Sequence, residues 1–252
     1  MKSFVASSLP DTGNMKKSER LQKYLARCGL CSRRKAEEYI REGRITVDGR
    51  IVTEMGTTLD PDTSEVLFDG ARVSPEKEKL YFLLNKPKGY VTTMSDPQNR
   101  PVVTSLVKGV DARLFPVGRL DFDTEGALLL TNDGELAQKI QHPSFETNKT
   151  YEALVRGVVP QNKVDQLEKG VILDGKMTSK ATIRYLNRKG KNQLLRITIH
   201  EGRKHQVKKM FQHIGHPVLH LRRTAYGKLT LGSLPTGQTR RLNPSDIKKI
   251  FL

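Results

Sequence analysis

Two aspartates and a glutamate lie beside an arginine in residues 118–126, which read Gly-Arg-Leu-Asp-Phe-Asp-Thr-Glu-Gly. The short apolar run 127–131 follows and is bounded by Gly126 and by Asn-Asp-Gly, so it predicts a buried strand with a turn at each end. Asp121 is therefore expected in a loop directly before a rigid element. A carboxylate placed in this way can act as a nucleophile.

The spacing of these carboxylates is also compatible with two other readings. Asp121 could hydrogen-bond its own backbone in an Asx turn, which is common for aspartate in a loop bounded by glycine. The carboxylates Asp121, Asp123 and Glu125 also fit the opening of a calcium-binding loop. However, position twelve of that loop would be Asn132 instead of a glutamate, and Arg119 lies nearby. The spacing alone thus leaves nucleophile and Asx turn open and disfavours calcium.

The 252 residues carry a large excess of positive charge, because 44 lysines and arginines face 27 acidic residues, for a formal net charge of +17. A polyanion is the partner that such a charge favours. The length is sufficient for two modest domains, each with a core of its own. No apolar run approaches the roughly 20 residues that span a bilayer, and residues 1–14 lack the pattern of a signal peptide. We therefore expect a cytoplasmic protein.

The cysteines and histidines do not predict a metal site. Cys28 and Cys31 form a single C-x-x-C, with neither a second pair for zinc nor the βαβ context of a redox site, so we expect reduced packing residues. Four histidines lie in a strongly basic stretch without nearby carboxylates to orient them, and we expect them to face RNA or solvent. They are His205, His213, His216 and His220.

The first 75 residues predict an N-terminal segment followed by a small unit of two helices and a hairpin. Residues 1–17 are expected to be disordered or an extra N-terminal segment, and the sequence leaves open whether Met1 or Met15 is the start. Helical spacing of apolar residues then predicts a helix that ends at Gly29, and Ser32 is expected to cap a second helix. The Asp-Gly pair within 44–52 predicts a hairpin with a type I′ turn.

Two groups of cations lie on these expected helices. One group shares the face of the first helix opposite its apolar side, and the other occupies the first turn of the second helix, where it opposes the helix dipole. A bound phosphate would relieve that conflict, because a helix N-terminus supplies N–H donors. A solvated charged face is the alternative for any single cation. The cations expected to contact RNA are Arg20, Lys23, Arg27, Arg33, Arg34 and Lys35.

This pattern resembles the S4 RNA-binding domain in residues 20–25, 32–36 and 47–49. The resemblance covers residues 18–75 and implies binding to structured RNA. It does not decide on catalysis, because S4 domains occur in ribosomal proteins, in a tRNA synthetase and in rRNA-modifying enzymes. Residues 76–79 are the expected linker to the next domain.

Residues 80–252 predict a larger second domain in which strands outnumber helices and do not alternate regularly with them. We therefore expect an α+β fold, with a mixed, mainly antiparallel sheet following the small first domain. On the last of the expected helices, apolar spacing leaves Lys204 and Lys208 together on a face away from the core. The expected strands are 80–85, 127–131, 151–155, 181–186 and 194–200, and the expected helices are 161–170 and 205–214.

Four motifs in this second domain resemble those of one enzyme family. They are Lys-Pro-Lys-Gly at 86–89, the Gly-Arg-Leu-Asp turn at 118–121 with its continuation to Gly134, Lys-Thr-Tyr at 149–151, and Glu-Gly-Arg-Lys-His-Gln-Val-Lys-Lys-Met at 201–210. In this order, and with an S4 pattern on the N-terminal side, the chain resembles the RsuA/RluB/RluE/RluF family of pseudouridine synthases.

The resemblance implies a role for several residues and favours the nucleophile over the Asx turn. Asp121 would be the catalytic aspartate, Tyr151 the ring that stacks on the target base, and Lys208 the basic partner of the aspartate. Extruding a base from folded RNA costs a few kcal/mol, and stacking on an aromatic ring returns about 1 to 3 kcal/mol. No cofactor or metal is implied. The further residues expected to bind substrate are Lys86, Arg119, Arg203 and Gln206.

The implied reaction converts specific uridines of ribosomal RNA into pseudouridine. Residues 131–137 and His142-Pro143 look more like the branch that modifies large-subunit rRNA, whereas residues 204–208 resemble the small-subunit enzymes. We expect 23S rRNA as the substrate, with 16S rRNA as the alternative. Attack of Asp121 at C1′, attack at C6 and a glycal route all remain open.

Two other classes of protein are alternatives to this interpretation. The first is a non-catalytic RNA-binding protein of ribosome assembly, which would have no chemical need for an aspartate, a tyrosine and a lysine at these positions. The second is a glycosidase, which would need a second carboxylate such as Asp123. The expected partner is ribosomal RNA or a ribosome assembly intermediate, and we expect a monomer.

Overall fold

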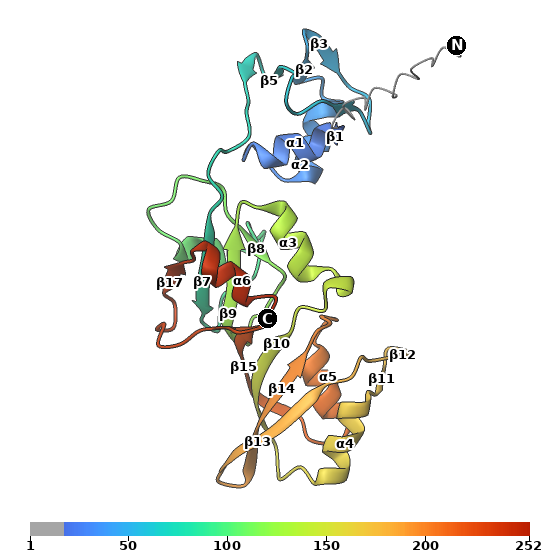
Figure 1. Ribbon diagram of the computed structural model, residues 1–252, viewed down its shortest axis with the longest axis vertical. Coiled ribbons are helices and arrows are strands. Elements are labelled where there is room, and N and C mark those ends of the chain that lie inside the picture. Colours follow the sequence, from blue (N-terminus) through green and yellow to red (C-terminus); the bar gives the residue numbers. More distant parts are fainter. Residues whose placement is uncertain (1–17) are drawn as a thin grey trace, which may run out of the picture. The chain divides into compact units, whose positions relative to one another are not determined.

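The computed structural model describes residues 18–252, so the expectations for residues 1–17 lie outside it. The chain divides into two compact units, the first ending at Lys77 and the second spanning Glu78–Leu252 (Figure 1). Helices and strands are mixed in both units, which confirms the predicted α+β class. Among the described residues, no helix is both long enough and apolar enough to cross a membrane.

In the first unit, two helices pack against a small antiparallel sheet with the strand order β3-β2-β5-β6. Its core consists of the buried apolar side chains of both layers, among them Leu21, Leu25, Ile40 and Ile45. A separate pair of short strands, β1 and β4, lies beside the first helix. The elements are β1 (Glu19–Arg20), α1 (Leu21–Arg27), α2 (Arg33–Arg41), β2 (Ile45–Val47), β3 (Arg50–Val52), β4 (Thr58–Leu59), β5 (Val66–Phe68) and β6 (Ala71–Arg72).

The predicted cap and turn residues lie at or just beyond the ends of these elements. The backbone of Gly29 turns left-handed after α1, with φ at +74°. The Ser32 hydroxyl accepts a hydrogen bond from the Lys35 N–H at 3.1 Å, so the predicted cap of α2 is confirmed. Asp48 and Gly49 both have positive φ, as the predicted type I′ turn between β2 and β3 requires.

A nine-stranded sheet with the main order β13-β14-β10-β15-β9-β7-β17 runs through the second unit. Its strands pair antiparallel except for β9 and β15, which pair in parallel, so the predicted mixed, mainly antiparallel sheet is confirmed. The strands are β7 (Tyr81–Lys86), β8 (Phe115–Val117), β9 (Glu125–Thr131), β10 (Lys149–Val155), β13 (Thr182–Lys189), β14 (Asn192–Ile199), β15 (Val218–Tyr226), β16 (Leu229–Thr230) and β17 (Thr239–Arg241).

Helices cover this sheet unevenly. Helices α4 (Gln161–Lys169) and α5 (Gln206–His213) share one core with the inward side chains of β10 and β14, such as Ala153 and Ile197. Helices α3 (Gly134–Gln141) and α6 (Pro244–Lys249) share a second core with β7 and β9. The short elements η1 (Val103–Leu106), η2 (Pro143–Phe145), β11 (Ile172–Leu173) and β12 (Lys176–Met177) complete the unit.

The last 27 residues, whose role the sequence left open, close the edge of the sheet. Strand β17 pairs with β7, and Ile250 lies in the second core. Further inside the sheet, the parallel pairing of β9 with β15 places Gly126 opposite Arg223, and the φ of Gly126 is +108°. A Cβ at this position would lie 2.1 Å from the Arg223 carbonyl oxygen. Only glycine therefore allows this contact, which holds the loop 118–124 beside β15.

Candidate active site

A cleft of about 1040 Å³ opens in the second unit and brings together side chains from distant parts of the sequence. Its walls come from the loop before β9, from β10, from the segment before α5 and from β15. Lysines and arginines outnumber carboxylates along these walls, so the cleft attracts anions. The charged lining residues, histidines apart, are Arg119, Asp121, Glu146, Lys149, Glu201, Arg203, Lys204, Lys208 and Arg223.

The buried Lys86 holds the backbone of the loop that presents Asp121. Its Nζ donates hydrogen bonds to the carbonyls of Pro87 at 3.0 Å, Asp121 at 3.0 Å and Thr124 at 2.9 Å. The side chain has no exposed surface. Burial lowers the pKa of Lys86 to about 8, although the nearby carboxylates act in the opposite direction. Lys86 thus positions Asp121 by holding the backbone of its loop.

We predict that activity falls as the pH rises through about 8, because Lys86 then loses its proton. The ammonium has three charged N–H donors for three carbonyls, whereas the neutral amine has two uncharged ones, so the hydrogen bonds that hold the Asp121 loop weaken. The titration of Lys86 affects the stability of the fold in the opposite direction to activity. The pKa of Lys86 in the fold lies below that of an unfolded lysine, about 10.4. Lys86 therefore makes the fold more stable as the pH rises between these two values.

The measurement is kcat against pH, recorded together with the thermal unfolding midpoint. Lys149 needs a control, because burial lowers its pKa to about 8 as well, and its Nζ is bonded to the carbonyls of Thr147 and His200. The fall in kcat should persist in Lys149→Met. A wild-type profile that stays flat through pH 8 would contradict the positioning role of Lys86.

The carboxylate of Asp121 lies between two basic side chains. Lys208 Nζ is 3.3 Å from its Oδ2, and His205 Nε2 is 3.4 Å from its Oδ1. Lys208 is also 2.5 Å from Asp123 Oδ1, and this hydrogen bond lowers the pKa of Asp123. The Asp121 side chain is 31% exposed and that of Asp123 is 70% exposed. Asp121 is therefore the more sheltered of two carboxylates that share one lysine.

The fold of α5 explains why Lys208 reaches the cleft. Val207, Met210 and Phe211 are buried in the core, which leaves Lys208 on the side of the helix that faces Asp121. His205 precedes the helix in a left-handed conformation, with φ at 56°. No carboxylate was expected near the histidines, and the structure corrects this, because His205 lies beside Asp121 and His220 lies 3.1 Å from Glu125. These carboxylates are distant in sequence, so spacing could not reveal the contacts.

Tyr151 lies on the inward face of β10 and lines the cleft beside the Asp121 loop. The register of β10 against β15 shifts between Thr150 and Tyr151. Arg223 Nη1 donates a hydrogen bond to the Tyr151 hydroxyl at 3.3 Å, which fixes the tilt of the ring from its polar end. The ring is almost fully buried, at 8% exposure.

Arg223 lines the cleft but was not among the site residues predicted from the sequence. Its side chain is buried at 3% exposure, its Nε donates to the Ala127 carbonyl at 2.7 Å, and its guanidinium lies 4.5 Å from the centre of the Tyr226 ring. Nη2 has no hydrogen-bond partner among the described residues. The strand pattern does contain a signal, because Leu221 and Arg223 alternate on one buried face. An arginine at an apolar position of a core strand marks a functional candidate.

Two residues expected to bind substrate line the cleft and also make hydrogen bonds to other parts of the protein, so their contact with substrate stays a prediction. The Gln206 side chain is buried, accepts from the Arg203 N–H at 2.9 Å and donates to Glu201. The Arg203 guanidinium contacts Glu201 at 3.1 Å, the Lys176 carbonyl at 3.0 Å and the Met177 carbonyl. Together they tie the segment before α5 to the β11–β12 hairpin.

The other two expected substrate-binding residues differ from each other. Lys86 is fully buried and has no surface that a substrate can touch, and its Nζ donates to two carbonyls of the Asp121 loop and to that of Pro87, which corrects its assignment. Arg119 is exposed, lines the cleft and has no side-chain partner among the described residues. Of the four, Arg119 is the side chain left free to meet a phosphate of the substrate.

Of the six cations expected to contact RNA in the first unit, three are paired with acidic side chains of the protein. Glu19 pairs with Lys23 at 3.2 Å and with Arg27 at 2.8 Å. Lys35 pairs with Glu38 at 2.7 Å, and its ammonium lies over the Tyr39 ring. The three cations that are exposed without a side-chain partner in the described part of the chain are Arg20, Arg33 and Arg34.

We predict that Arg33→Ala combined with Arg34→Ala weakens rRNA binding and flattens its salt dependence. Each phosphate contact on a single strand contributes about 0.7 to the slope of log K against log salt, so the slope should fall by about 1.4. Lys35→Ala is the matched control and should have the smaller effect, because Glu38 already neutralises this lysine. An unchanged slope in the double variant would remove the first unit from the binding surface.

The two cysteines pack in the core of the first unit. Cys31 is buried, and burial raises the pKa of the Cys28 thiol to about 12, which makes it a poor nucleophile and a poor metal ligand. Both are free thiols. Within residues 18–252, no group of three or more histidine, cysteine or acidic side chains is arranged to hold a metal ion.

Family profiles match both units of the chain. The S4 domain matches residues 19–63, and the family described as RNA pseudouridylate synthase matches residues 80–213. The fold and the cleft are thus those of an RNA-modifying enzyme with an added RNA-binding unit. The chain belongs to the RNA pseudouridylate synthase family, as its motifs predicted.

Individual relatives match almost the whole chain. The ribosomal large subunit pseudouridine synthase B of Bacillus subtilis (strain 168) is 44% identical, over 92% of this chain and 95% of the relative. The protein of the same name from Yersinia pestis is 38% identical, over 87% of this chain and 71% of the relative. A crystal structure of a pseudouridylate synthase superposes with a TM-score of 0.67 at 31% identity, and covers 92% of this chain and 99% of the other.

Proposed function

We propose that this protein converts specific uridines of large-subunit (23S) ribosomal RNA into pseudouridine. The observation that carries the proposal is the group of three side chains in one cleft, where the Asp121 carboxylate lies 3.3 Å from the Lys208 ammonium and shares its walls with Tyr151. The names of the relatives from Bacillus subtilis and Yersinia pestis support the large subunit as the source of the substrate.

The reaction needs only the uridine and the protein. The N1–C1′ bond breaks, the C5–C1′ bond forms, the hydrogen on C5 leaves to water and N1 gains a proton. In each of the three possible routes, the ionised carboxylate of Asp121 must contact the nucleoside. Lys208 supplies the positive charge next to it. Tyr151 stacks on the extruded base and offsets much of the cost of flipping it out of the RNA.

The test is tritium release from rRNA labelled at uridine C5, measured separately on large-subunit and small-subunit transcripts with a chelator present. We predict release from the large-subunit RNA alone, at a rate that the chelator does not change. Release from small-subunit RNA alone would favour the alternative to which residues 204–208 point. Tight binding of both RNAs without release from either would favour a non-catalytic assembly protein.

We also propose that a single chain acts alone on the rRNA, in the cytoplasm. Support for a monomer comes from the cleft, because the residues that line it all belong to the second unit, which brings Asp121, Tyr151 and Lys208 together by itself. Sedimentation of the active enzyme at working concentration checks this.

A further inference from the structure

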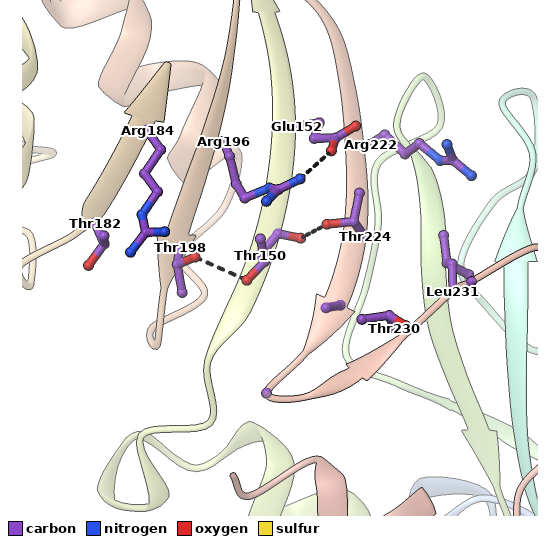
Figure 2. A pocket seen from close by; sticks show the side chains of 13 residues that line it. Thr150, Glu152, Thr182, Arg184, Arg196, Thr198, Arg222, Thr224, Thr230 and Leu231 are labelled. Atoms are coloured by element: carbon purple, nitrogen blue, oxygen red, sulfur yellow. Dashed lines mark hydrogen bonds and ion pairs between the residues drawn. The ribbon is translucent and has the colours of Figure 1, made fainter. Parts of the chain in front are cut away.

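A second hollow of about 610 Å³ lies on the face of the sheet opposite the active-site cleft (Figure 2). Successive side chains of a strand point to opposite faces, so Tyr151 lines the cleft while its neighbours Thr150 and Glu152 line the hollow. Helices α4 and α5 bury the inward face of these strands, whereas none of the residues lining the hollow comes from a helix. This part of the sheet therefore presents its polar face to solvent.

A row of charges crosses four strands at the hollow. The register places Arg184 of β13 opposite Arg196 of β14, Arg196 opposite Glu152 of β10, and Glu152 opposite Arg222 of β15. Like charges directly opposite each other on neighbouring strands are destabilising. Glu152 pairs with Arg196 at 3.1 Å, and one carboxylate cannot balance three guanidinium groups.

Two of these arginines have no side-chain partner among residues 18–252. Arg184 and Arg222 make no side-chain hydrogen bond or ion pair within the described part of the chain. Figure 2 shows Arg196 directed toward Glu152, and Arg222 extending away from that pair. This row of charges therefore leaves two guanidinium groups without a counter-charge, on a face of the sheet that no helix covers. An anionic ligand would supply the missing charge.

The other residues of the hollow indicate which part of an RNA fits there. Threonine hydroxyls form a second row across the same strands, and Thr150 Oγ1 lies 3.0 Å from Thr198 Oγ1. Hydroxyls and guanidinium groups bind phosphate and ribose oxygens. No aromatic side chain lines the hollow, so it has no platform on which a base can stack. The lining therefore suits an RNA backbone and does not read its sequence.

We propose that this hollow binds the phosphate backbone of a second segment of the RNA whose target uridine occupies the cleft. Strand β13 is the edge of the sheet, and only β14 separates it from β10. At about 4.8 Å between strands, the path from β10 to this edge is about 10 Å. A long RNA can pass round the edge from one face to the other, whereas a short hairpin that fills the cleft does not reach the hollow.

The test compares two double variants that remove the same number of arginines. Arg184→Gln with Arg222→Gln removes the unpaired cations of the hollow. Arg188→Gln with Arg156→Gln is the matched control, because both arginines are exposed and neither lines the hollow or the cleft. The probes are a long large-subunit rRNA transcript and a short hairpin containing the target uridine.

For the hollow variant, the salt-dependence slope for the transcript should fall by about 1.4, which corresponds to two phosphate contacts. The loss of affinity should be the same on a transcript of unrelated sequence. Tritium release from the short hairpin should equal that of the wild type. The control should leave both measurements unchanged, and the thermal unfolding midpoints should show that all proteins are folded.

Three results would overturn the proposal. The first is an unchanged slope in the hollow variant, and the second is an equal loss in the control, which would show diffuse charge instead of a site. The third is a loss on ribosomal precursor particles without a loss on the naked transcript, which would identify an acidic protein as the partner. Failure of the wild-type enzyme to turn over any RNA would count against the proposed function and would leave the slope test intact.

Discussion

Asp121→Asn is expected to abolish pseudouridine formation while RNA binding persists. The amide has the shape of the carboxylate but lacks its negative charge, so it cannot serve as a nucleophile, and loss of a nucleophile costs on the order of 10⁴-fold or more in rate. RNA affinity should stay equal or rise, because the variant removes one negative charge from a cleft that binds a polyanion. Single-turnover tritium release and direct titration of the RNA measure the two effects separately.

The neighbouring carboxylate provides a closely matched control. Asp123 contacts the same lysine at a shorter distance, and its side chain is more than twice as exposed as that of Asp121. Asp123→Asn should therefore keep its rate within about tenfold of the wild type, since exposed ion pairs contribute little. An equal loss in both variants would indicate two cooperating carboxylates, as in a glycosidase. Wild-type rates in Asp121→Asn would place the nucleophile elsewhere.

The elements that the sequence predicted well are those in which periodicity and end signals agree. The predicted strand 127–131 corresponds to β9, and the predicted helix 161–170 corresponds to α4. Helix α3 was missed because its first residues also read as a turn. Asp133 lies in an Asn-Asp-Gly sequence that favours a turn, yet its carboxylate accepts the N–H groups of Glu135 and Leu136 and caps the helix.

The sequence predicted the polar residues that project into the cleft more accurately than those that support it. Asp121 and Lys208 meet there, although they are 87 positions apart in the sequence, because their motifs are specific. Lys86 and Gln206 were assigned to the substrate but are buried within the protein. In a chain with 44 lysines and arginines, residue type alone does not indicate whether the side chain of a given lysine or arginine is buried. Whether it faces solvent or the protein's own carbonyls depends on tertiary packing, which composition and local spacing do not encode.

Arg223→Met is expected to lower kcat/KM by about 100-fold on a short hairpin substrate without lowering stability. The loss follows from the hydrogen bond between Arg223 Nη1 and the Tyr151 hydroxyl, because small misplacements of a reacting group cost roughly this factor. Stability should hold or increase, because a buried guanidinium with an unpaired Nη2 carries a desolvation cost that an apolar side chain of similar length avoids. Steady-state kinetics and thermal unfolding midpoints measure both quantities.

Tyr151→Phe separates this positioning role from a direct contact of Arg223 with the substrate. If Arg223 acts by orienting the ring, the two substitutions remove the same interaction, and the double variant should lose little more than Arg223→Met alone. Additive losses would instead mean that Arg223 meets the RNA itself through Nη2. Arg222→Met is the matched control from the opposite face of β15, and its turnover of the short hairpin should be that of the wild type. A fall in stability in Arg223→Met alone would show that the buried charge supports the fold, and the arginine would then be a structural residue that happens to border the cleft.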